Sequence, residues 1–402
     1  MVVNDAYVSL VGSGDQTLAG TGAIPYLDVS KPSGDVLLPG DFRIDSTGSF
    51  SILTGSGLIR NTGGRLVFAG GSTDVDFTGT IDDVEVDGSG LELLQDLAVN
   101  DTLTITSLSS LRGPGDLKVS GGVTSNDASW VVIDDAYVSL VGSTDQTLTG
   151  SGYIPYLDVS KPSGDVLLPS DFLIDSTGSF RWLTGSGRFR NTGGRLIFDG
   201  NTDVDFAGTI DDLVLDGNGT VEMLQDLAVG NDLTITNLNV LRGPGVLKVT
   251  GDVTADDSIY RVISSAYVRL VGSADQTLTG SGALAYLDVS KPSGDVLLPG
   301  DFRLAESTTG PRLTGGGWIR NTGGRLVFDD TGTLDFSGSV DDLELVGSGA
   351  VTLPQDLVVN DTLTITSLSS LTGPGDLKVS GGVTSNDASW VVINDAYVSL
   401  VG

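Results

Sequence analysis

The thirteen residues LDVSKPSGDVLLP occupy positions 27–39, and they return unchanged at 157–169 and at 287–299. The first residues of the copies, Leu27, Leu157 and Leu287, are evenly spaced along the chain. Similarity at a fixed long interval is typical of solenoids, in which each unit stacks on its neighbours. The motif carries almost no reactive chemistry. Its constancy fits a structural role that recurs once per repeat, and recent duplication explains it as readily as function does.

The rest of the chain follows the same interval. The heptapeptide AYVSLVG begins at Ala6, Ala136 and Ala396, and AYVRLVG begins at Ala266. We therefore predict one continuous solenoid over residues 1–402. Its sequence repeats would span 4–133, 134–263 and 264–393, with the start of a fourth at 394–402.

The apolar runs are short, alternate with polar residues and are rich in β-branched side chains, as in YVSLV, RLVF and TLTIT. This pattern favours strands, and no segment shows a sustained helical stripe. Weaker internal similarities at intervals of 55 and about 75 residues divide into coils of about 18–19 residues. The sequence thus predicts an all-β parallel β-helix with seven coils per repeat, with six longer coils as the alternative.

The repeated motif can be read as strand, corner and strand. Leu27 and Val29 should point into the core, and Asp28 and Ser30 should point to solvent. Residues 32–34 should form the corner, and residues 36–38 the next strand. Lys31 precedes a proline, which favours an extended backbone.

The segment GSGDQTLAGTGAIPYLDVSKPSGDVLLPGDF from Gly12, and the TLTIT segments from Thr102 and Thr362, resemble known repeats. They are similar to the filamentous-haemagglutinin and autotransporter-like β-helices of large secreted bacterial surface proteins. The resemblance implies a right-handed coil and an extracellular or cell-surface location. It also implies a role in a stalk, a fibre or adhesion.

The composition excludes several classes of site. The chain has no His and no Cys, so it offers no imidazole base, thiolate, zinc site or disulfide. Its 52 acidic and 21 basic residues give a formal charge of -31, which argues against nucleic acid and anionic membranes as partners. No apolar run approaches the roughly 20 residues of a membrane helix, so we expect no membrane insertion.

Acidic pairs are the candidate metal ligands. A DD pair recurs once in each repeat, at a predicted turn, and hard oxygen ligands at a turn suit calcium. Aspartates at corners also cap backbone groups, and no recognised calcium loop is present, so we expect a structural role and no required cofactor. The weak calcium candidates are Asp82, Asp83, Asp211, Asp212, Asp341 and Asp342.

We expect no enzymatic activity. A glycosidase needs two carboxylates in one cleft, but the acids here recur with the repeat and no insertion would build a cleft. Arg60 and Arg65 flank NTGG and could clamp a sugar or a carboxylate. The favoured interpretation is that they pair with aspartates on neighbouring coils.

Aromatic residues recur with the repeat and could form a glycan-binding strip or fill the core and corners. We favour filling, with Trp182 and Trp318 as surface positions outside the pattern. The periodic positions are Tyr7, Tyr137, Tyr267 and Tyr397; Tyr26, Tyr156 and Tyr286; and Trp130, Tyr260 and Trp390.

Both termini fall inside repeat sequence, and open solenoid ends favour edge-to-edge pairing. We therefore expect a structural rod in an extracellular filament or long surface fibre, with self-association end to end as the partner interaction. The alternative is an adhesin that binds a glycan or a cell surface, with binding lost on changing Trp182 or Trp318.

Overall fold

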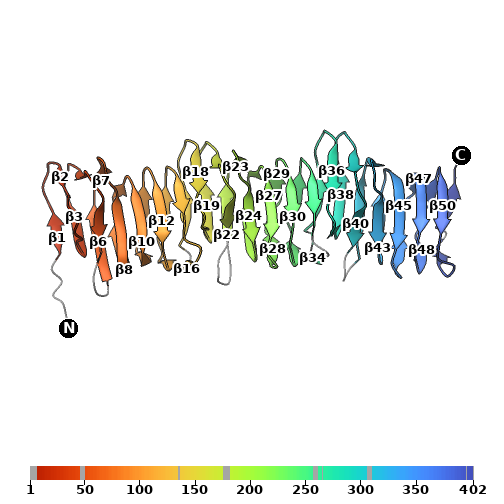
Figure 1. Ribbon diagram of the computed structural model, residues 1–402, viewed down its shortest axis with the longest axis horizontal. Helices are drawn as coiled ribbons and strands as arrows, with labels where there is room; N and C mark the ends of the chain where they lie inside the picture. Colours follow the sequence, from red (N-terminus) through yellow and green to blue (C-terminus); the bar gives the residue numbers. More distant parts are fainter. Residues whose placement is uncertain are drawn as a thin grey trace. The chain divides into compact units, whose positions relative to one another are not determined.

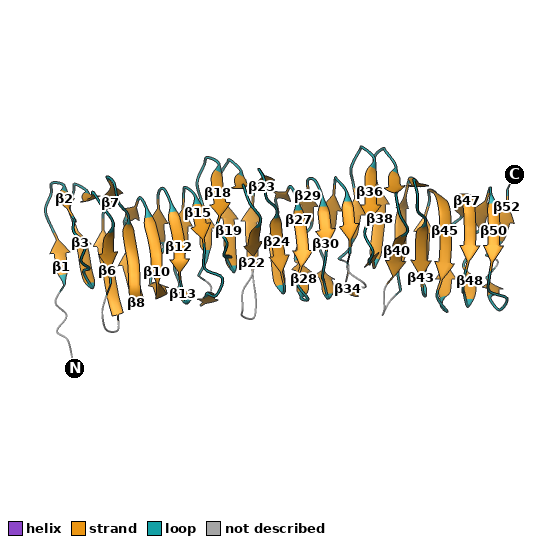
Figure 2. Cartoon of the chain, viewed as in Figure 1, coloured by secondary structure: helices purple, strands orange, loops and turns teal. Residues whose placement is uncertain are grey.

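The computed structural model describes residues 7–45, 50–134, 136–174, 182–256, 261–264, 266–305, 310–394 and 396–401. Within these ranges there is no helix, and none therefore spans a membrane. The chain divides into two compact units, residues 1–196 and 197–402, which are described separately. The all-β prediction is confirmed, because the strands run parallel and stack as a β-solenoid of about 18 turns (Figures 1 and 2).

The first unit has three stacks of parallel strands. Stack A contains β1 (Val8–Leu10), β3 (Tyr26–Ser30), β6 (Phe50–Ser56), the second half of β8 (Leu66–Phe77), the second half of β10 (Val84–Leu93), β13 (Ser110–Arg112) and β16 (Val131–Ile133). Stack B contains β2 (Gln16–Thr17), β4 (Val36–Leu38), β7 (Leu58–Asn61), β9 (Thr80–Ile81), β11 (Leu97–Val99), β14 (Leu117–Val119), β17 (Val138–Leu140), β19 (Tyr156–Ser160) and β22 (Trp182–Ser186). Stack C contains β5 (Phe42–Ile44), the first halves of β8 and β10, β12 (Leu103–Ser107), β15 (Val123–Ser125), β18 (Gln146–Thr149), β20 (Val166–Leu168) and β23 (Arg188–Asn191). A bridge joins Tyr153 to β21 (Phe172–Ile174), and β24 (Leu196–Asp199) begins at the last residue of the unit.

The second unit is built in the same way. Stack D contains β25 (Thr202–Phe206), β28 (Thr220–Met223), β31 (Val240–Gly243) and β34 (Arg261–Ser264). Stack E contains β26 (Thr209–Ile210), β29 (Leu227–Val229), β32 (Leu247–Val249), β35 (Val268–Leu270), β38 (Tyr286–Ser290), β41 (Arg312–Gly316), β44 (Gly332–Phe336), β46 (Ala350–Thr352), β48 (Ser370–Thr372) and β51 (Val391–Ile393). Stack F contains β27 (Leu213–Asp216), β30 (Leu233–Ile235), β33 (Val253–Ala255), β36 (Gln276–Thr279), β39 (Val296–Leu298), β42 (Trp318–Asn321), the first parts of β45 (Ser339–Val346) and β47 (Leu357–Ile365), β49 (Leu377–Val379) and β52 (Val398–Leu400). Stack G contains β37 (Ala283–Leu284), β40 (Phe302–Ala305), β43 (Leu326–Asp329), the second parts of β45 and β47, and β50 (Gly382–Ser385).

Alternation along each strand builds the core. Leu27 and Val29 are buried, while Asp28 and Ser30 face outward, as the sequence predicted. The parallel register places like residues above one another, since Leu27 pairs with Leu53 and Leu53 with Val75. Continuous columns of Leu, Val, Ile and Phe result, and burying them is the main stabilising term of the fold.

The turns are longer than the sequence suggested. Along stack A, paired residues lie 19, 26, 22, 18, 20 and 21 positions apart, from Val8 through Leu27 to Val132. The expected division into seven coils per repeat was therefore wrong, and the alternative of six longer coils was nearer. The total is about 18 turns, against the roughly 21 expected from the shorter coil.

The repeat is out of phase with the three faces. β1 lies in stack A, but β17, its equivalent in the next repeat, lies in stack B. Likewise β4 lies in stack B and its equivalent β20 lies in stack C. The second unit shows the same shift, from β29 in stack E to the start of β47 in stack F. One repeat thus takes the chain through six complete turns and then on to the next of the three faces.

Candidate functional site

The invariant motif contains a lysine that is withdrawn from solvent. The Lys161 ammonium reaches back to the preceding turn and donates to the carbonyls of Gly142 (2.9 Å) and Thr144 (2.8 Å) and to Gln146 Oε1 (2.6 Å). Lys31 makes the equivalent bonds to Gly12, Gly14 and Gln16, and Lys291 to Gly272, Ala274 and Gln276. We call this arrangement the lysine clamp.

In the second and third repeats the glutamine extends the clamp. Gln146 Nε2 donates to the carbonyls of Val119 and Gly121 one turn further back, and its Oε1 also accepts from Gly142 N–H. Gln276 repeats this with Val249 and Gly251. These two clamps therefore connect three successive turns, and all three lysine donors are used inside the fold.

Sequence reasoning missed the lysine clamp. It treated Lys31 only as a residue before a proline. A signal was present, because GSxDQT precedes the motif at a constant distance in every repeat. Each clamp lysine thus follows a glutamine at the same separation, as Lys31 follows Gln16.

In the first repeat the candidate calcium ligands accept hydrogen bonds from the protein. Asp82 Oδ2 accepts from Asn61 N–H (3.2 Å), and Asp82 Oδ1 accepts from Asn100 Nδ2 (3.2 Å). Asp83 Oδ1 accepts from the backbone N–H (3.0 Å) and the hydroxyl (2.5 Å) of Thr102 on the next turn. Both carboxylates cap the adjacent turns, as the structural interpretation expects.

The third repeat uses its pair in the same way. Asp341 is buried, and it accepts from Trp318 Nε1 (2.6 Å), Asn360 Nδ2 (3.0 Å) and Asn321 N–H (3.2 Å). Asp342 accepts from Thr362 N–H (2.9 Å) and from the Asn321 amide.

In the second repeat, Asp211 is buried and Asp212 accepts from Asp232 N–H (3.1 Å). Burial and the negative charges of the neighbouring pair raise the pKa of Asp101, and the same causes raise the pKa of Asp361. No group of three or more acidic side chains with metal-binding geometry occurs in the described part of the chain.

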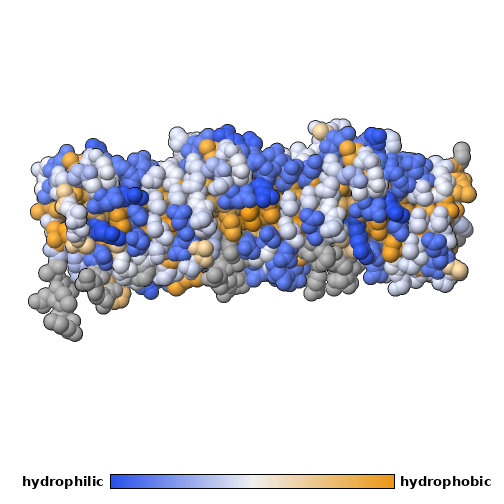
Figure 3. Space-filling model, in the orientation of Figure 1, coloured by the Kyte–Doolittle hydropathy of each residue, from blue (hydrophilic) through white to orange (hydrophobic). Residues whose placement is uncertain are grey.

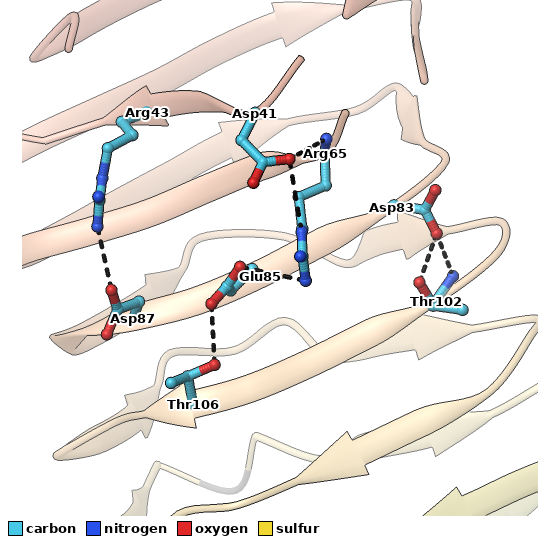
Figure 4. Close-up of polar contacts among 8 residues, drawn as sticks. All are labelled: Asp41, Arg43, Arg65, Asp83, Glu85, Asp87, Thr102 and Thr106. Carbon is cyan, nitrogen blue, oxygen red and sulfur yellow. Dashed lines mark hydrogen bonds and ion pairs between the residues drawn. The ribbon is translucent and has the colours of Figure 1, made fainter. Parts of the chain in front are cut away.

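Arginines and acids alternate on the outer surface of stack C (Figure 4). Arg65 lies 3.6 Å from Asp41 on the turn before and 3.2 Å from Glu85 on the turn after, and its own backbone N–H also donates to Asp41. Arg43 pairs with Asp87 at 3.0 Å.

Arg60 pairs with Asp35 at 2.8 Å. The expected pairing of Arg60 and Arg65 with acids of neighbouring turns is therefore confirmed. These exposed pairs relieve like-charge repulsion and add little stability individually.

Shallow polar hollows lie beside these arginines. One of about 740 Å³ is lined by Arg43, Asp41, Glu85 and Asp87, among others. A hollow of about 260 Å³ at Gly63–Gly64 recurs in the third repeat as one of about 380 Å³ at Gly323–Gly324. Figure 3 shows hydrophilic residues spread over the visible surface of each unit, with small apolar patches between them.

Among the described periodic aromatics, Trp130 fills the core and its equivalent Trp390 is half-buried. Trp130 is fully buried, and its indole N–H donates to the carbonyl of Tyr153 (3.0 Å), whose hydroxyl donates to the Trp130 carbonyl (3.2 Å). Tyr260 lies outside the described residues.

The tyrosines of the second and third repeats form outward pairs on adjacent turns and do not fill the core, and Tyr7 and Tyr397 are exposed. Tyr137 and Tyr156 meet edge to face at 5.7 Å, and Tyr267 and Tyr286 stack at 4.2 Å. Arg269 covers the ring of Tyr267 and Arg312 covers that of Tyr286.

The two tryptophans outside the repeat pattern, Trp182 and Trp318, differ in their contacts. Trp318 is 41% exposed, but Arg320 lies over its ring and its indole N–H is bonded to Asp341. Trp182 is half-buried beside Tyr156, with which it pairs across β19 and β22. Both are surface positions, as predicted.

Comparison with family models, curated proteins and solved structures finds no match for this chain.

Proposed function

We propose that this chain is a structural spacer within an extracellular filament or long cell-surface fibre. The main support for the proposal is that polar side chains of this chain bond to neighbouring turns of the same solenoid. The lysine of every clamp is bonded to the preceding turn, and Gln146 bonds to the turn before that. Asp83 and Arg65 likewise bond to adjacent turns. Polar groups that bond neighbouring turns together stabilise the stack, and this suits a mechanical role.

The resemblance to secreted bacterial β-helix proteins supports the same function and location. So does the acidic surface, because a formal charge of -31 opposes side-by-side clustering of copies. A continuous apolar core with inter-turn hydrogen bonds resists local unfolding and therefore proteolysis.

Self-association end to end is part of this proposal, and apolar residues near residue 400 are its candidate contact. Val383 and Leu400 are 39% and 72% exposed, whereas their equivalents Val123 and Leu140 are buried. A second copy stacked on these residues would cover them.

Electron microscopy of the purified protein tests this proposal. We expect elongated particles of uniform width, either single or joined end to end. Compact particles, or turnover of a polysaccharide that one Asp-to-Asn change abolishes, would overturn it.

A separate variant tests the proposed end-to-end contact. Leu400→Asp places a charge on the exposed apolar end and should prevent joined particles. Asn386→Asp adds the same charge at an exposed position outside that apolar set and is the matched control. Joined particles that persist in L400D would exclude this end as the contact.

A further inference from the structure

Three aromatic residues occupy neighbouring outward positions on three successive turns of the first unit. Tyr137 precedes β17, Tyr156 begins β19 and Trp182 begins β22. Tyr156 and Trp182 are paired in the register, and the residues that follow them, Leu157 and Leu183, point into the core. We call Tyr137, Tyr156 and Trp182 the aromatic row.

Trp182 is the residue that distinguishes this row from its equivalents. In the first repeat, Tyr26 pairs with Ile52, and in the third, Tyr286 pairs with Arg312. The tyrosines are constant, so the packing of the turn does not require an indole at the third place. A departure from the repeat at an outward position is where a specific contact can be added without disturbing the fold.

The contacts of the Trp182 indole also differ from those of the other surface tryptophan. Trp318, the other surface tryptophan, donates its N–H to Asp341 and carries Arg320 on its ring. For Trp182 the described part of the chain provides neither a hydrogen-bond acceptor for the indole nor a cation on the ring. A half-buried indole whose N–H is available can bind a ligand that has an apolar face and hydroxyl groups.

The geometry and charge of the row define the ligand class. Successive turns rise by about 4.8 Å, which is close to the length of one sugar unit, so a linear glycan along the row would place one ring at each turn. The chain is strongly acidic, and this disfavours a polyanion. Tyrosine and tryptophan are also the side chains that dominate binding energy at protein interfaces.

We propose that the aromatic row binds a neutral linear polysaccharide, with Trp182 stacked on a sugar ring. This goes beyond a spacer function, because it adds a ligand contact at one place along the solenoid. The equivalent rows, which carry Ile52 or Arg312, would lack this contact.

Calorimetric titration of the whole chain with a β-1,4-linked glucose hexasaccharide tests the proposal. The variant Trp182→Ile introduces the residue that the first repeat carries at the same place, so the fold should be retained. We expect at least tenfold weaker binding in W182I and unchanged binding in Trp318→Phe. Melting temperature and circular dichroism report that both variants are folded.

Three results would overturn the proposal. The first is no binding of the neutral hexasaccharide at millimolar concentration. The second is equal binding by W182I and the unchanged protein. The third is tighter binding of a galacturonate hexasaccharide than of the neutral one, because that would assign the row to an acidic glycan.

Discussion

At the scale of single residues, the lysine clamp gives one position of the repeated motif a structural role. An ammonium group removed from water is costly unless several acceptors surround it. Lys161 is buried and has three acceptors, and its burial lowers the pKa of the amine. Burial likewise lowers the pKa of Lys291. A change at the lysine, the glutamine or the corner would leave the others unsatisfied.

Replacing Lys161 by Met should therefore destabilise the solenoid locally. The aliphatic stem is retained, but the carbonyls of Gly142 and Thr144 lose the lysine as donor and Gln146 Oε1 keeps only the Gly142 N–H, at a cost of about 2 kcal/mol. Urea unfolding should show an earlier transition. Lys248→Met is the control, since Lys248 is exposed and pairs with Asp226, and it should change the midpoint little. Equal effects of the two variants would contradict the clamp.

Asp171 predicts an acid-dependent loss of stability. The Arg195 side-chain hydrogen bond, helped by the Arg195 backbone N–H, lowers the pKa of Asp171 below its ordinary value of 3.8. A lowered carboxyl pKa stabilises the fold above the ordinary value, and this contribution is lost as the pH falls through the folded-state pKa.

Asp171→Asn keeps an acceptor for the backbone N–H but removes the charge. At pH 7 the melting temperature of D171N should be lower than that of the unchanged protein. This difference in melting temperature should shrink at pH 3. A difference that is the same at both values would mean that the carboxylate charge contributes nothing.

At the scale of strands and turns, the fold class followed directly from the sequence. Alternation in YLDVS gave the correct inward and outward residues, because one buried face forces a period of two. The coil length did not follow. The predicted coil length takes the interval of 55 residues, which separates the similar segments at Val296 and Val351, as a whole number of turns. In the structure β39 lies in stack F and β46 in stack E. The interval between them is therefore not a whole number of turns.

The candidate sites were predictable only in part. Asp82 and Asp83 could be recognised as corner residues because aspartate caps turns. The sequence could not show that the Trp318 indole donates to Asp341 while no acceptor for the Trp182 indole lies among the described residues, since those contacts depend on the register between turns.

Gly185, within strand β22, has a strict backbone requirement. Its φ is +92°, and a Cβ there would lie 2.3 Å from the Val159 carbonyl oxygen of the preceding turn. Gly185→Ala should therefore lower the free energy of unfolding by about 3 kcal/mol or more, because it introduces both backbone strain and a clash with main-chain atoms. Chemical denaturation would measure the loss.

Gly40→Ala provides the comparison for this substitution. A Cβ at Gly40 meets no atom within 4 Å, and the second repeat carries Ser170 at the equivalent place. The unfolding free energy of G40A should be close to that of the unchanged protein. A loss as large as that of G185A would contradict the backbone geometry assigned to Gly185.

At the scale of the whole molecule, the formal charge of -31 should make stability depend on salt. Added salt screens repulsion between exposed carboxylates over about 8 Å at 0.15 M ionic strength. We expect the melting temperature to rise with sodium chloride. Calcium should give the same rise as magnesium at equal concentration, because N–H donors already occupy both oxygens of Asp341.

Calorimetry with each cation would check this expectation. A saturable gain with calcium that magnesium does not give, and that Asp341→Asn removes, would assign a calcium site to the acidic pair.

The shift of one face per repeat has a mechanical consequence. The turn that separates Leu27 from its partner Leu53 is the longest in stack A, and its equivalent separates Leu157 from Leu183 in stack B. If repeats were in phase, every long turn would fall on one side, and an uninterrupted array would curve steadily. Because equivalent strands move to the next face, as from β3 in stack A to β19 in stack B, the longest turns of successive repeats lie over different faces and do not accumulate on one side.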